Sequence, residues 1–330
     1  MNFENVIGID VSKNTIDVCI HISQLSNQFK NTNKGLSNFL KWVKLNEGNT
    51  NNILFVFEHT GMYSHLITTF FEDNECLYFI APALDIKRSM GIVRGKDDQV
   101  DAKRIALYGY RLKDEIKTTK KHNKSITQLK SLMSLKSKLI KQRAAYKGTL
   151  SEQKNIYKTK DFKTIFEVQE KMIRYLTKQI KNIESEIISI IEKENEFLNN
   201  LNLILSIKGI GMQMATTMLI FTENFSKFEN WRKFASYCGV APFPYQSGTS
   251  IKGRNRVSQL ANKKIKALIH MCAISAIQHN PEMKNYYLKR VKIGKSKMST
   301  INIIRNKLIA RIFAVIKRQT PYVNTMKFVA

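Results

Sequence analysis

Acidic residues are scarce in this 330-residue sequence. It contains 26 Asp and Glu against 54 Lys and Arg, which gives a formal net charge of +28. So large an excess of positive charge indicates a polyanionic partner such as a nucleic acid. The chain is long enough for two or three domains, because single hydrophobic cores rarely grow past about 250 residues.

Cysteine is also rare, and its spacing excludes two common kinds of small domain. The four cysteines are far apart and form no C-x-x-C pair: Cys19, Cys76, Cys238 and Cys272. Neither a zinc knuckle nor a disulfide framework is indicated, so we expect reduced, structural thiols. The six histidines are equally scattered, and a histidine metal site is not expected.

Long apolar anchors and lipidation signals are missing, which argues against a membrane partner. The N-terminus leads directly into the strand-like run 6–9, without the basic segment and cleavage site of a signal peptide. We therefore expect a protein of the cytoplasm.

The first part of the chain alternates strand-like and helix-like runs. Strands are predicted at 5–11, 16–22, 53–57 and 77–81, and helices at 35–45, 63–73 and 98–112. The first two strands form a predicted hairpin that turns at Lys13-Asn14. Residues 1–115 are thus predicted to be an α/β domain that begins with antiparallel strands.

The rest of the chain is predicted to be helical. Residues 116–200 are Lys-rich, with an apolar stripe formed by Leu176, Ile180, Ile183, Ile187 and Ile190. The stripe fits either a helical hairpin packed on its own chain or a coiled coil that joins subunits. Residues 201–330 form a third, mostly helical region, in which the Gly- and Pro-rich segment 239–253 is expected to be an exposed loop.

Four acids fall where secondary-structure elements begin or end. Asp10 and Glu58 end two predicted strands, while Asp98 and Asp101 stand three residues apart at the start of a predicted helix. An acid within an apolar strand is costly without a compensating role, which singles out Asp10. Asp17, in the partner strand, is expected to face solvent.

Such acids suit a metal-dependent reaction on phosphodiesters. Two divalent ions about 4 Å apart bind the attacking and leaving oxygens, and Mg²⁺ prefers carboxylate ligands, with Mn²⁺ as a possible substitute. The alternative for Asp98 and Asp101 is that they are ordinary first-turn acids, which stabilise a helix N-terminus.

The segment around Ser247 offers a possible nucleophile. Ser247 is followed by Gly248 and by three cations that could hold phosphate, Lys252, Arg254 and Arg256. There is no G-x-S-x-G motif and no neighbouring histidine base, so acyl transfer is disfavoured. Attack on phosphorus would need another activator, such as metal ions held by the acids; the alternative is an ordinary surface loop.

Residues 206–211 are predicted to form a helix-hairpin-helix turn. In such turns, backbone amides at a helix N-terminus contact DNA phosphates without reading sequence. The expected contact residues are Lys208, Gly209 and Gly211. The alternative is a Gly-rich connection between two helices.

Together these motifs resemble the transposases of insertion-sequence family 110, including its 1111 branch, which are related to the Piv and MooV DNA invertases. The resemblance covers nearly the whole chain. It is carried by Gly8-Ile9-Asp10-Val11-Ser12-Lys13, Glu58-His59-Thr60-Gly61, Lys96-Asp97-Asp98-Gln99-Val100-Asp101-Ala102, Gly239-Val240-Ala241-Pro242 and Ser247-Gly248.

The resemblance implies a RuvC-like, RNase-H-like domain over 1–115, a coiled-coil spacer over 116–200 and a helical transposase domain over 201–330. Asp10, Glu58, Asp98 and Asp101 would bind Mg²⁺, and Ser247 would form a covalent phosphoserine with DNA, without ATP. The family also implies donor and target DNA, a structured guide RNA encoded by the element, and a homo-oligomer, dimer or tetramer, in which one subunit's serine domain completes another's acidic site.

Two positions depart from the family pattern. Asp97 stands where the family usually has Thr, so the register of the third acid, Asp97 or Asp98, depends on the three-residue step to Asp101. Ala261 stands where Gly usually precedes Asn262. Two rival hypotheses remain: a RuvC-like nuclease in which water attacks, and a structural nucleic-acid-binding protein without activity.

Overall fold

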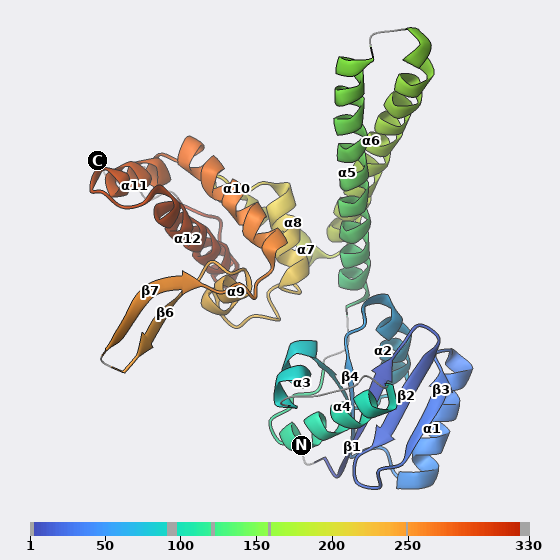
Figure 1. Ribbon diagram of the computed structural model, residues 1–330. Coiled ribbons are helices and arrows are strands. Elements are labelled where there is room, and N and C mark those ends of the chain that lie inside the picture. The colour runs from blue at the N-terminus through green and yellow to red at the C-terminus, as the bar shows by residue number, and fades with distance from the viewer. Residues whose placement is uncertain (1–2, 91–97, 120–122, 158–159, 249, 324–330) are drawn as a thin grey trace. The chain divides into compact units, whose positions relative to one another are not determined.

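The computed structural model describes residues 3–90, 98–119, 123–157, 160–248 and 250–323 (Figure 1). The side chains of Asp98, Lys160, Ser247, Ile251 and Lys252 also lie outside the described part. The chain forms two compact units, Met1–His122 and Asn123–Ala330. None of the described helices combines the length and the apolar character needed to span a lipid bilayer.

The N-terminal unit is built on a five-stranded mixed sheet with the order β3-β2-β1-β4-β5. Its strands are β1 (Asn5–Val11), β2 (Thr15–Ile20), β3 (Ser26–Lys30), β4 (Ile53–Glu58) and β5 (Tyr78–Ala81). Strands β1, β2 and β3 are antiparallel neighbours, whereas β4 runs parallel to both β1 and β5. The predicted strands and the antiparallel start are thus confirmed.

Helices cover both faces of this sheet. They are α1 (Asn33–Glu47), η1 (Gly61–Tyr63), α2 (Ser64–Asp73), α3 (Ala83–Ser89) and α4 (Asp98–Leu112). Because side chains alternate along a strand, Ile7 and Ile9 of β1 pack in one core with α1 and α2, while Val6 packs in another with α3 and α4. The three predicted helices are confirmed; β3 and α3 were not predicted.

Two long helices open the second unit. They are α5 (Lys124–Ile156) and α6 (Lys163–Glu192), with η2 (Lys160–Phe162) before α6. Cross-contacts such as Lys136–Glu184 and Lys154–Glu170 show that they run antiparallel. Four residues of the predicted stripe are buried here, namely Leu176, Ile180, Ile187 and Ile190, so the apolar seam is occupied within the chain itself. Whether it also joins subunits stays a prediction.

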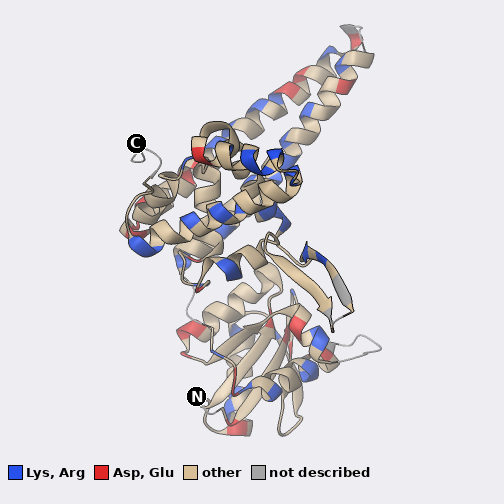
Figure 2. Cartoon of the chain, turned by 90° about the vertical axis from the view of Figure 1, so that its left-hand side faces the viewer, with Lys and Arg blue, Asp and Glu red and all other residues tan. Residues whose placement is uncertain are grey.

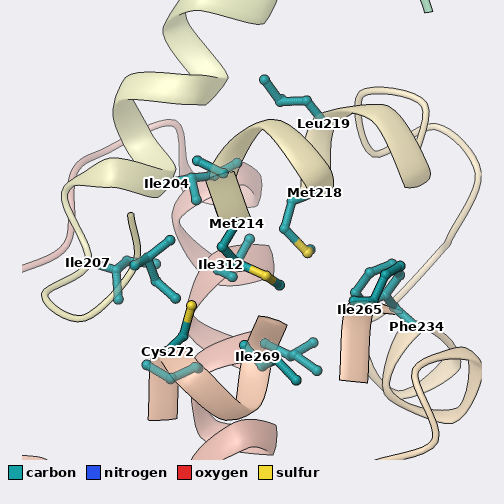
Figure 3. Packing of buried hydrophobic residues seen from close by; sticks show 14 of the residues in the cluster. Ile204, Ile207, Met214, Met218, Leu219, Phe234, Ile265, Ile269, Cys272 and Ile312 are labelled. Carbon is teal, nitrogen blue, oxygen red and sulfur yellow. The ribbon is translucent and has the colours of Figure 1, made fainter. Parts of the chain in front are cut away.

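The remaining helices form one core around α12 (Figure 3). They are α7 (Asn195–Leu205), α8 (Met212–Phe221), α9 (Trp231–Tyr237), α10 (Lys263–His279), α11 (Pro281–Lys292) and α12 (Lys297–Arg318). Ile204, Met214, Phe234, Ile269 and Ile312 bring five of these helices into contact at its centre. The prediction of a helical C-terminal region is confirmed.

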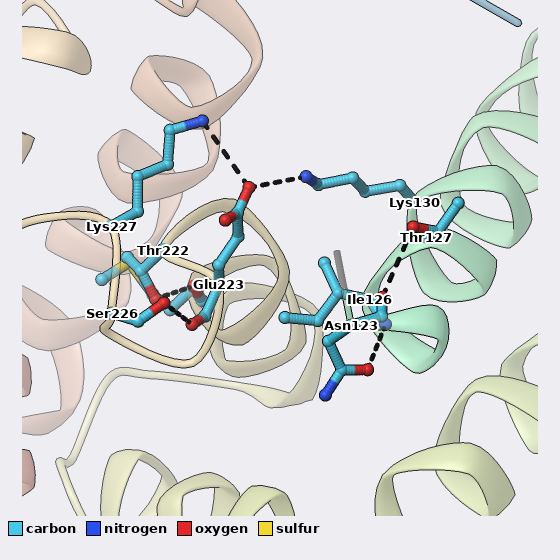
Figure 4. A network of polar contacts seen from close by, with 9 residues as sticks. Asn123, Ile126, Thr127, Lys130, Thr222, Glu223, Ser226 and Lys227 are labelled. Carbon is cyan, nitrogen blue, oxygen red and sulfur yellow. Dashed lines mark hydrogen bonds and ion pairs between the residues drawn. The ribbon is translucent and has the colours of Figure 1, made fainter. Parts of the chain in front are cut away.

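Polar contacts join α5 to the segment that follows α8 (Figure 4). The Asn123 side chain caps α5 by accepting hydrogen bonds from the backbone amides of Ser125 and Ile126. Glu223 is held between Lys130 on α5, at 2.9 Å, and Lys227, at 3.7 Å. These contacts fix the start of the long helical pair on the C-terminal core.

Segment 239–253, which was predicted to be an exposed loop, contains regular secondary structure. Most of it lies in a two-stranded hairpin, β6 (Pro242–Ser247) paired with β7 (Ile251–Val257). The described residues of the two strands are largely exposed, as expected of a functional loop. Phe243 and Tyr245 stand two residues apart on β6, which is the alternation typical of a strand. The neighbouring Gly and Pro residues obscured this signal.

Candidate functional site

Two acids lie side by side at the carboxyl ends of β1 and β4. The parallel register pairs Ile9 with Phe57, so the next positions, Asp10 and Glu58, are neighbours at the end of the ladder. Both side chains are half-buried. Alternation along β1 and β4 puts them on the same sheet face as Gly8, which is the face that α4 covers.

Helix α4 brings its N-terminus to the same edge. A Cβ on Gly8 would lie 2.2 Å from the Ala106 nitrogen and 2.3 Å from the Ala102 oxygen, so α4 crosses β1 in backbone contact. Further along the helix, Gly109 lies against Val6, near the start of β1. Helix α4 therefore runs opposite to β1, and its first turn begins near the end of the strand that carries Asp10.

The first turn of α4 carries the other two predicted acids. Asp101 is half-buried and accepts a 2.6 Å hydrogen bond from Arg104 Nη1 within the same helix. Asp98 is the first residue of α4, but its side chain lies outside the described residues, as does all of Asp97. The structure thus places the backbone positions of all four predicted acids at one edge of the sheet.

The donors at this edge are suited to a hard divalent cation. Asp10 and Glu58 offer adjacent carboxylates, and Asp101 a third that Arg104 now engages. Carboxylates are the protein ligands that Mg²⁺ and Mn²⁺ prefer. Among the residues whose side chains are described, no three acids, histidines or cysteines are already grouped as a metal site.

Asp17 is a fifth acid at this edge, and the prediction that it faces solvent is wrong. It pairs directly with Asp10 across β1 and β2 and is only 2% exposed. Gln28 Nε2 donates to both of its carboxylate oxygens, at 3.0 and 3.2 Å. A hairpin that turns at Lys13-Asn14 places residue 17 opposite residue 10, so the predicted turn itself contained the signal.

Thiols do not contribute to this chemistry. Cys19, Cys238 and Cys272 are buried and free, and Cys76 is half-buried and free. Burial raises the pKa of Cys238 to about 12 and that of Cys272 to about 11. Cys238 and Cys272 are therefore thiols at neutral pH, and the burial of Cys19, Cys238 and Cys272 agrees with the structural role predicted for them.

Ser247 is the last residue of β6, at the tip of the hairpin in the second unit. Its side chain and that of Lys252 lie outside the described residues, whereas Arg254 and Arg256 are exposed on β7. The register shifts by one residue between Phe243 and Tyr245, where Arg254 and Asn255 together face Pro244. Pro244 has no N–H to donate, which favours a bulge at this point.

The base of the hairpin is anchored on α12. Asn302 and Asn306 both donate side-chain hydrogen bonds to the Val240 carbonyl oxygen, each at 2.9 Å. Asn302 also accepts from Arg305 Nη1 at 3.4 Å, and Arg305 in turn contacts His270. Sequence reasoning missed these asparagines, because they lie some sixty residues from the segment they hold.

The position of Ala261 is compatible with an ordered turn. Its methyl group lies beside Gly239, where an added Cβ would come within 2.4 Å. The next residue, Asn262, caps α10 by accepting from the Ile265 amide, and its own amide donates to the Tyr237 carbonyl. Alanine in place of the usual glycine therefore leaves this turn ordered.

Residues 206–211 form the tight turn between α7 and α8. Gly209 has φ +102°, a conformation that favours glycine, and packs against Ala276 of α10. Lys208 and Gly211 are exposed. The turn therefore offers a cation and the amides of a helix N-terminus together, as phosphate binding requires.

Lys and Arg occur throughout the chain, but acidic residues are nearly absent from its last third (Figure 2). Residues 230–330 contain 20 Lys and Arg and a single acid, Glu282. That acid is already paired with Arg311. The surface that includes the hairpin is thus strongly cationic, in contrast to the acidic edge of the N-terminal sheet.

Comparisons with known proteins connect these features. Residues 7–154 match a transposase family model named for a DEDD motif and for IS110, and residues 201–288 match the model described as Transposase IS116/IS110/IS902 family. The pilin gene-inverting proteins of Moraxella bovis and Moraxella lacunata are each 28% identical over 324 residues, which are 96% of this chain and 97% of theirs. An IS110 protein of Streptomyces coelicolor is 26% identical over 121 residues, covering 37% of this chain and 30% of its own length.

Proposed function

Because the chain belongs to the IS110 family and is a DNA transposase or recombinase, we propose that it cuts and rejoins DNA by a serine-linked, metal-dependent reaction. Asp10, Glu58, Asp98 and Asp101 hold divalent ions, and Ser247 is the nucleophile. The observation that supports this most is the meeting of β1, β4 and the start of α4 at one edge of the sheet. An RNase-H-like fold of the N-terminal unit fits the same strand order.

The carboxylates and the serine have separate tasks. Two Mg²⁺ ions, or Mn²⁺ in their place, would supply Lewis-acid activation and charge neutralisation when bound. Asp10 and Glu58 bind and orient them from the sheet, and the residues of α4 complete the set. The hairpin, fixed through Asn302 and Asn306, presents Ser247 to the phosphodiester.

The proposed bond changes conserve phosphodiester energy. The Oγ–P bond forms as Ser247 loses its proton, and the bond from phosphorus to one deoxyribose oxygen breaks, with that oxygen taking up a proton. Attack by a second DNA strand reverses these changes and releases the serine. No nucleotide cofactor is needed for this exchange.

The partners follow from the charge and from the family. Donor and target DNA lie on the cationic surface of residues 230–330, with phosphate contacts from Lys208, Gly209, Gly211, Lys252, Arg254 and Arg256. A structured guide RNA selects the DNA, and the protein acts in the cytoplasm as a homo-oligomer, a dimer or tetramer. Two of the relatives are named as inverting a pilin gene, which is a rearrangement of DNA.

A denaturing gel tests the serine. Wild-type protein incubated with labelled DNA and Mg²⁺ should give a protein–DNA adduct that Ser247→Ala does not give, although it still binds DNA. Ser250→Ala, an exposed serine three residues away, is the matched control and should form the adduct normally. Adduct formation by Ser247→Ala at wild-type yield would remove this residue from the mechanism.

A second pair of variants tests the acids. Asp10→Asn should abolish Mg²⁺-dependent cleavage, whereas Asp73→Asn, an exposed acid at the end of α2, should cleave normally. Normal cleavage by Asp10→Asn contradicts the metal site. The rival nuclease, in which water attacks, predicts free DNA ends with no adduct, and an inactive structural protein predicts binding without cleavage.

A further inference from the structure

The hairpin presents two aromatic residues to solvent on one strand. Tyr245 is 67% exposed and Phe243 is 45% exposed. Both stand on β6, two residues apart, so strand alternation puts their positions on the same face. Single exposed apolar residues are common on proteins, but a pair on one face of a protruding hairpin indicates a binding surface.

The opposite strand supports the Tyr245 ring. Tyr245 pairs with Gly253, and a Cβ at Gly253 would lie 2.8 Å from Tyr245 Cδ1. The absence of a side chain at this position leaves the space that the ring occupies. The ring is therefore braced against β7 while most of its surface stays accessible.

Charge around the rings defines the class of ligand. The sequence has no Asp or Glu between Glu229 and Glu282. Arg254 and Arg256 are exposed on β7, and in the described part of the chain no ion pair engages either of them. Cations beside exposed rings, without competing carboxylates, suit single-stranded nucleic acid, because phosphates bind the cations and unpaired bases stack on the rings.

We propose that Tyr245, with Phe243 beside it, stacks an unpaired DNA base next to the phosphate that Ser247 attacks, an inference that rests on the proposed role of Ser247. The two-residue step from Tyr245 to Ser247 along β6 spans about 7 Å, which is twice the spacing of about 3.4 Å between stacked bases. A base on Tyr245 thus belongs to a nucleotide flanking the reacting phosphate. Bases inside a duplex are covered by their neighbours, so this surface takes a base only where the DNA has opened.

The test measures stacking without chemistry. Full-length protein carrying Ser247→Ala, in EDTA, is titrated into a single-stranded DNA oligonucleotide that contains 2-aminopurine, and into the same sequence as a duplex. Stacking should quench the fluorescence of the single strand and leave the duplex signal unchanged. Introducing Tyr245→Ala into the Ser247→Ala protein should remove the quenching and weaken binding about tenfold. Tyr245→Phe, which keeps the ring, should preserve both the quenching and the affinity.

Tyr175 provides the matched control. It is a tyrosine of similar exposure, 58%, on α6, and Tyr175→Ala should change neither quenching nor affinity. Unaltered quenching and affinity in Tyr245→Ala would overturn the proposal, and so would equal or stronger quenching with an RNA strand of the same sequence. Quenching that requires Tyr245, in a protein whose wild type forms no DNA adduct, supports the stacking surface and contradicts the serine mechanism instead.

Discussion

The closest backbone contact at the acidic edge can be tested with a single methyl group. In Gly8→Ala, the new Cβ would stand 2.2 Å from the Ala106 nitrogen and 2.3 Å from the Ala102 oxygen. Non-bonded heavy atoms settle at about 3.5–4 Å, so α4 must retreat from the sheet by about 1 Å or more. Overpacking of this kind costs about 1–3 kcal/mol of the free energy of unfolding.

Activity should fall further than stability. Helix α4 carries Asp98 and Asp101 in its first turn, and its retreat moves both away from Asp10 and Glu58. A misplacement of about 1 Å in a reacting geometry lowers the rate about 100-fold. We therefore expect Gly8→Ala to fold, with a lower midpoint in urea, and to cleave DNA about 100-fold more slowly than the wild type.

Urea unfolding and a plasmid cleavage assay measure these two effects. Gly148→Ala is the control, because its new Cβ, within α5, would meet nothing within 4 Å beyond its chain neighbours and the backbone of its own helix. There alanine should stabilise the helix by about 0.5–1 kcal/mol and leave cleavage unchanged. Wild-type stability and cleavage in Gly8→Ala would refute the close packing of α4 on β1.

Three further substitutions test other parts of the structure. Gly239→Ala combines a φ of +66° with a Cβ 2.4 Å from that of Ala261, so it should lower the free energy of unfolding by about 2–4 kcal/mol, and Ala261→Gly should restore only the part due to the clash. Asp17→Asn removes one of two like charges that face each other across β1 and β2; in EDTA it should raise the free energy of unfolding in urea by up to about 1 kcal/mol. It should also reduce the stabilisation given by Mg²⁺, whereas an unchanged Mg²⁺ response would contradict this. Burial lowers the pKa of His270 from 6.5, so the unfolded chain takes up the proton first and stability falls as the pH drops below about 6.5; His270→Gln should flatten this decline, and an equal slope in both proteins would count against it.

The fold was predictable where burial and periodicity agree. Strand β1 was predicted at its exact bounds because its apolar residues are buried on both faces of the sheet. Strand β3 was missed because its sequence, Ser-Asn-Gln-Phe-Lys, is polar and lies at the edge of the sheet, where pairing with β2 rather than apolar burial holds it. The β6–β7 hairpin was taken for a loop because Pro and Gly are read as breaks, although a bulge accommodates Pro244 within a strand.

The acidic edge could be predicted only in part. Strand ends and a helix start indicated Asp10, Glu58 and Asp101, because neighbouring parallel strands end at one edge. The predicted hairpin already placed Asp17 opposite Asp10, but its burial was missed, because this face of β2 is covered by α4, an element more than eighty residues away. Asn302 and Asn306 could not have been found at all, because only the packing of α12 brings them to the Val240 carbonyl.

The acids and the serine lie in different compact units of the chain, and this separation makes a last prediction possible. Ser247→Ala keeps the acids, and Asp10→Asn keeps the serine, so neither variant alone should form an adduct. If the serine of one subunit completes the acidic edge of another, random mixing gives half hybrid dimers, each with one intact site of two, and adducts should return to about a quarter of the wild-type yield. If each subunit completes its own site, mixing the two variants restores no adduct. In that case the wild-type protein should also form adducts at full yield at dilutions where it is a monomer.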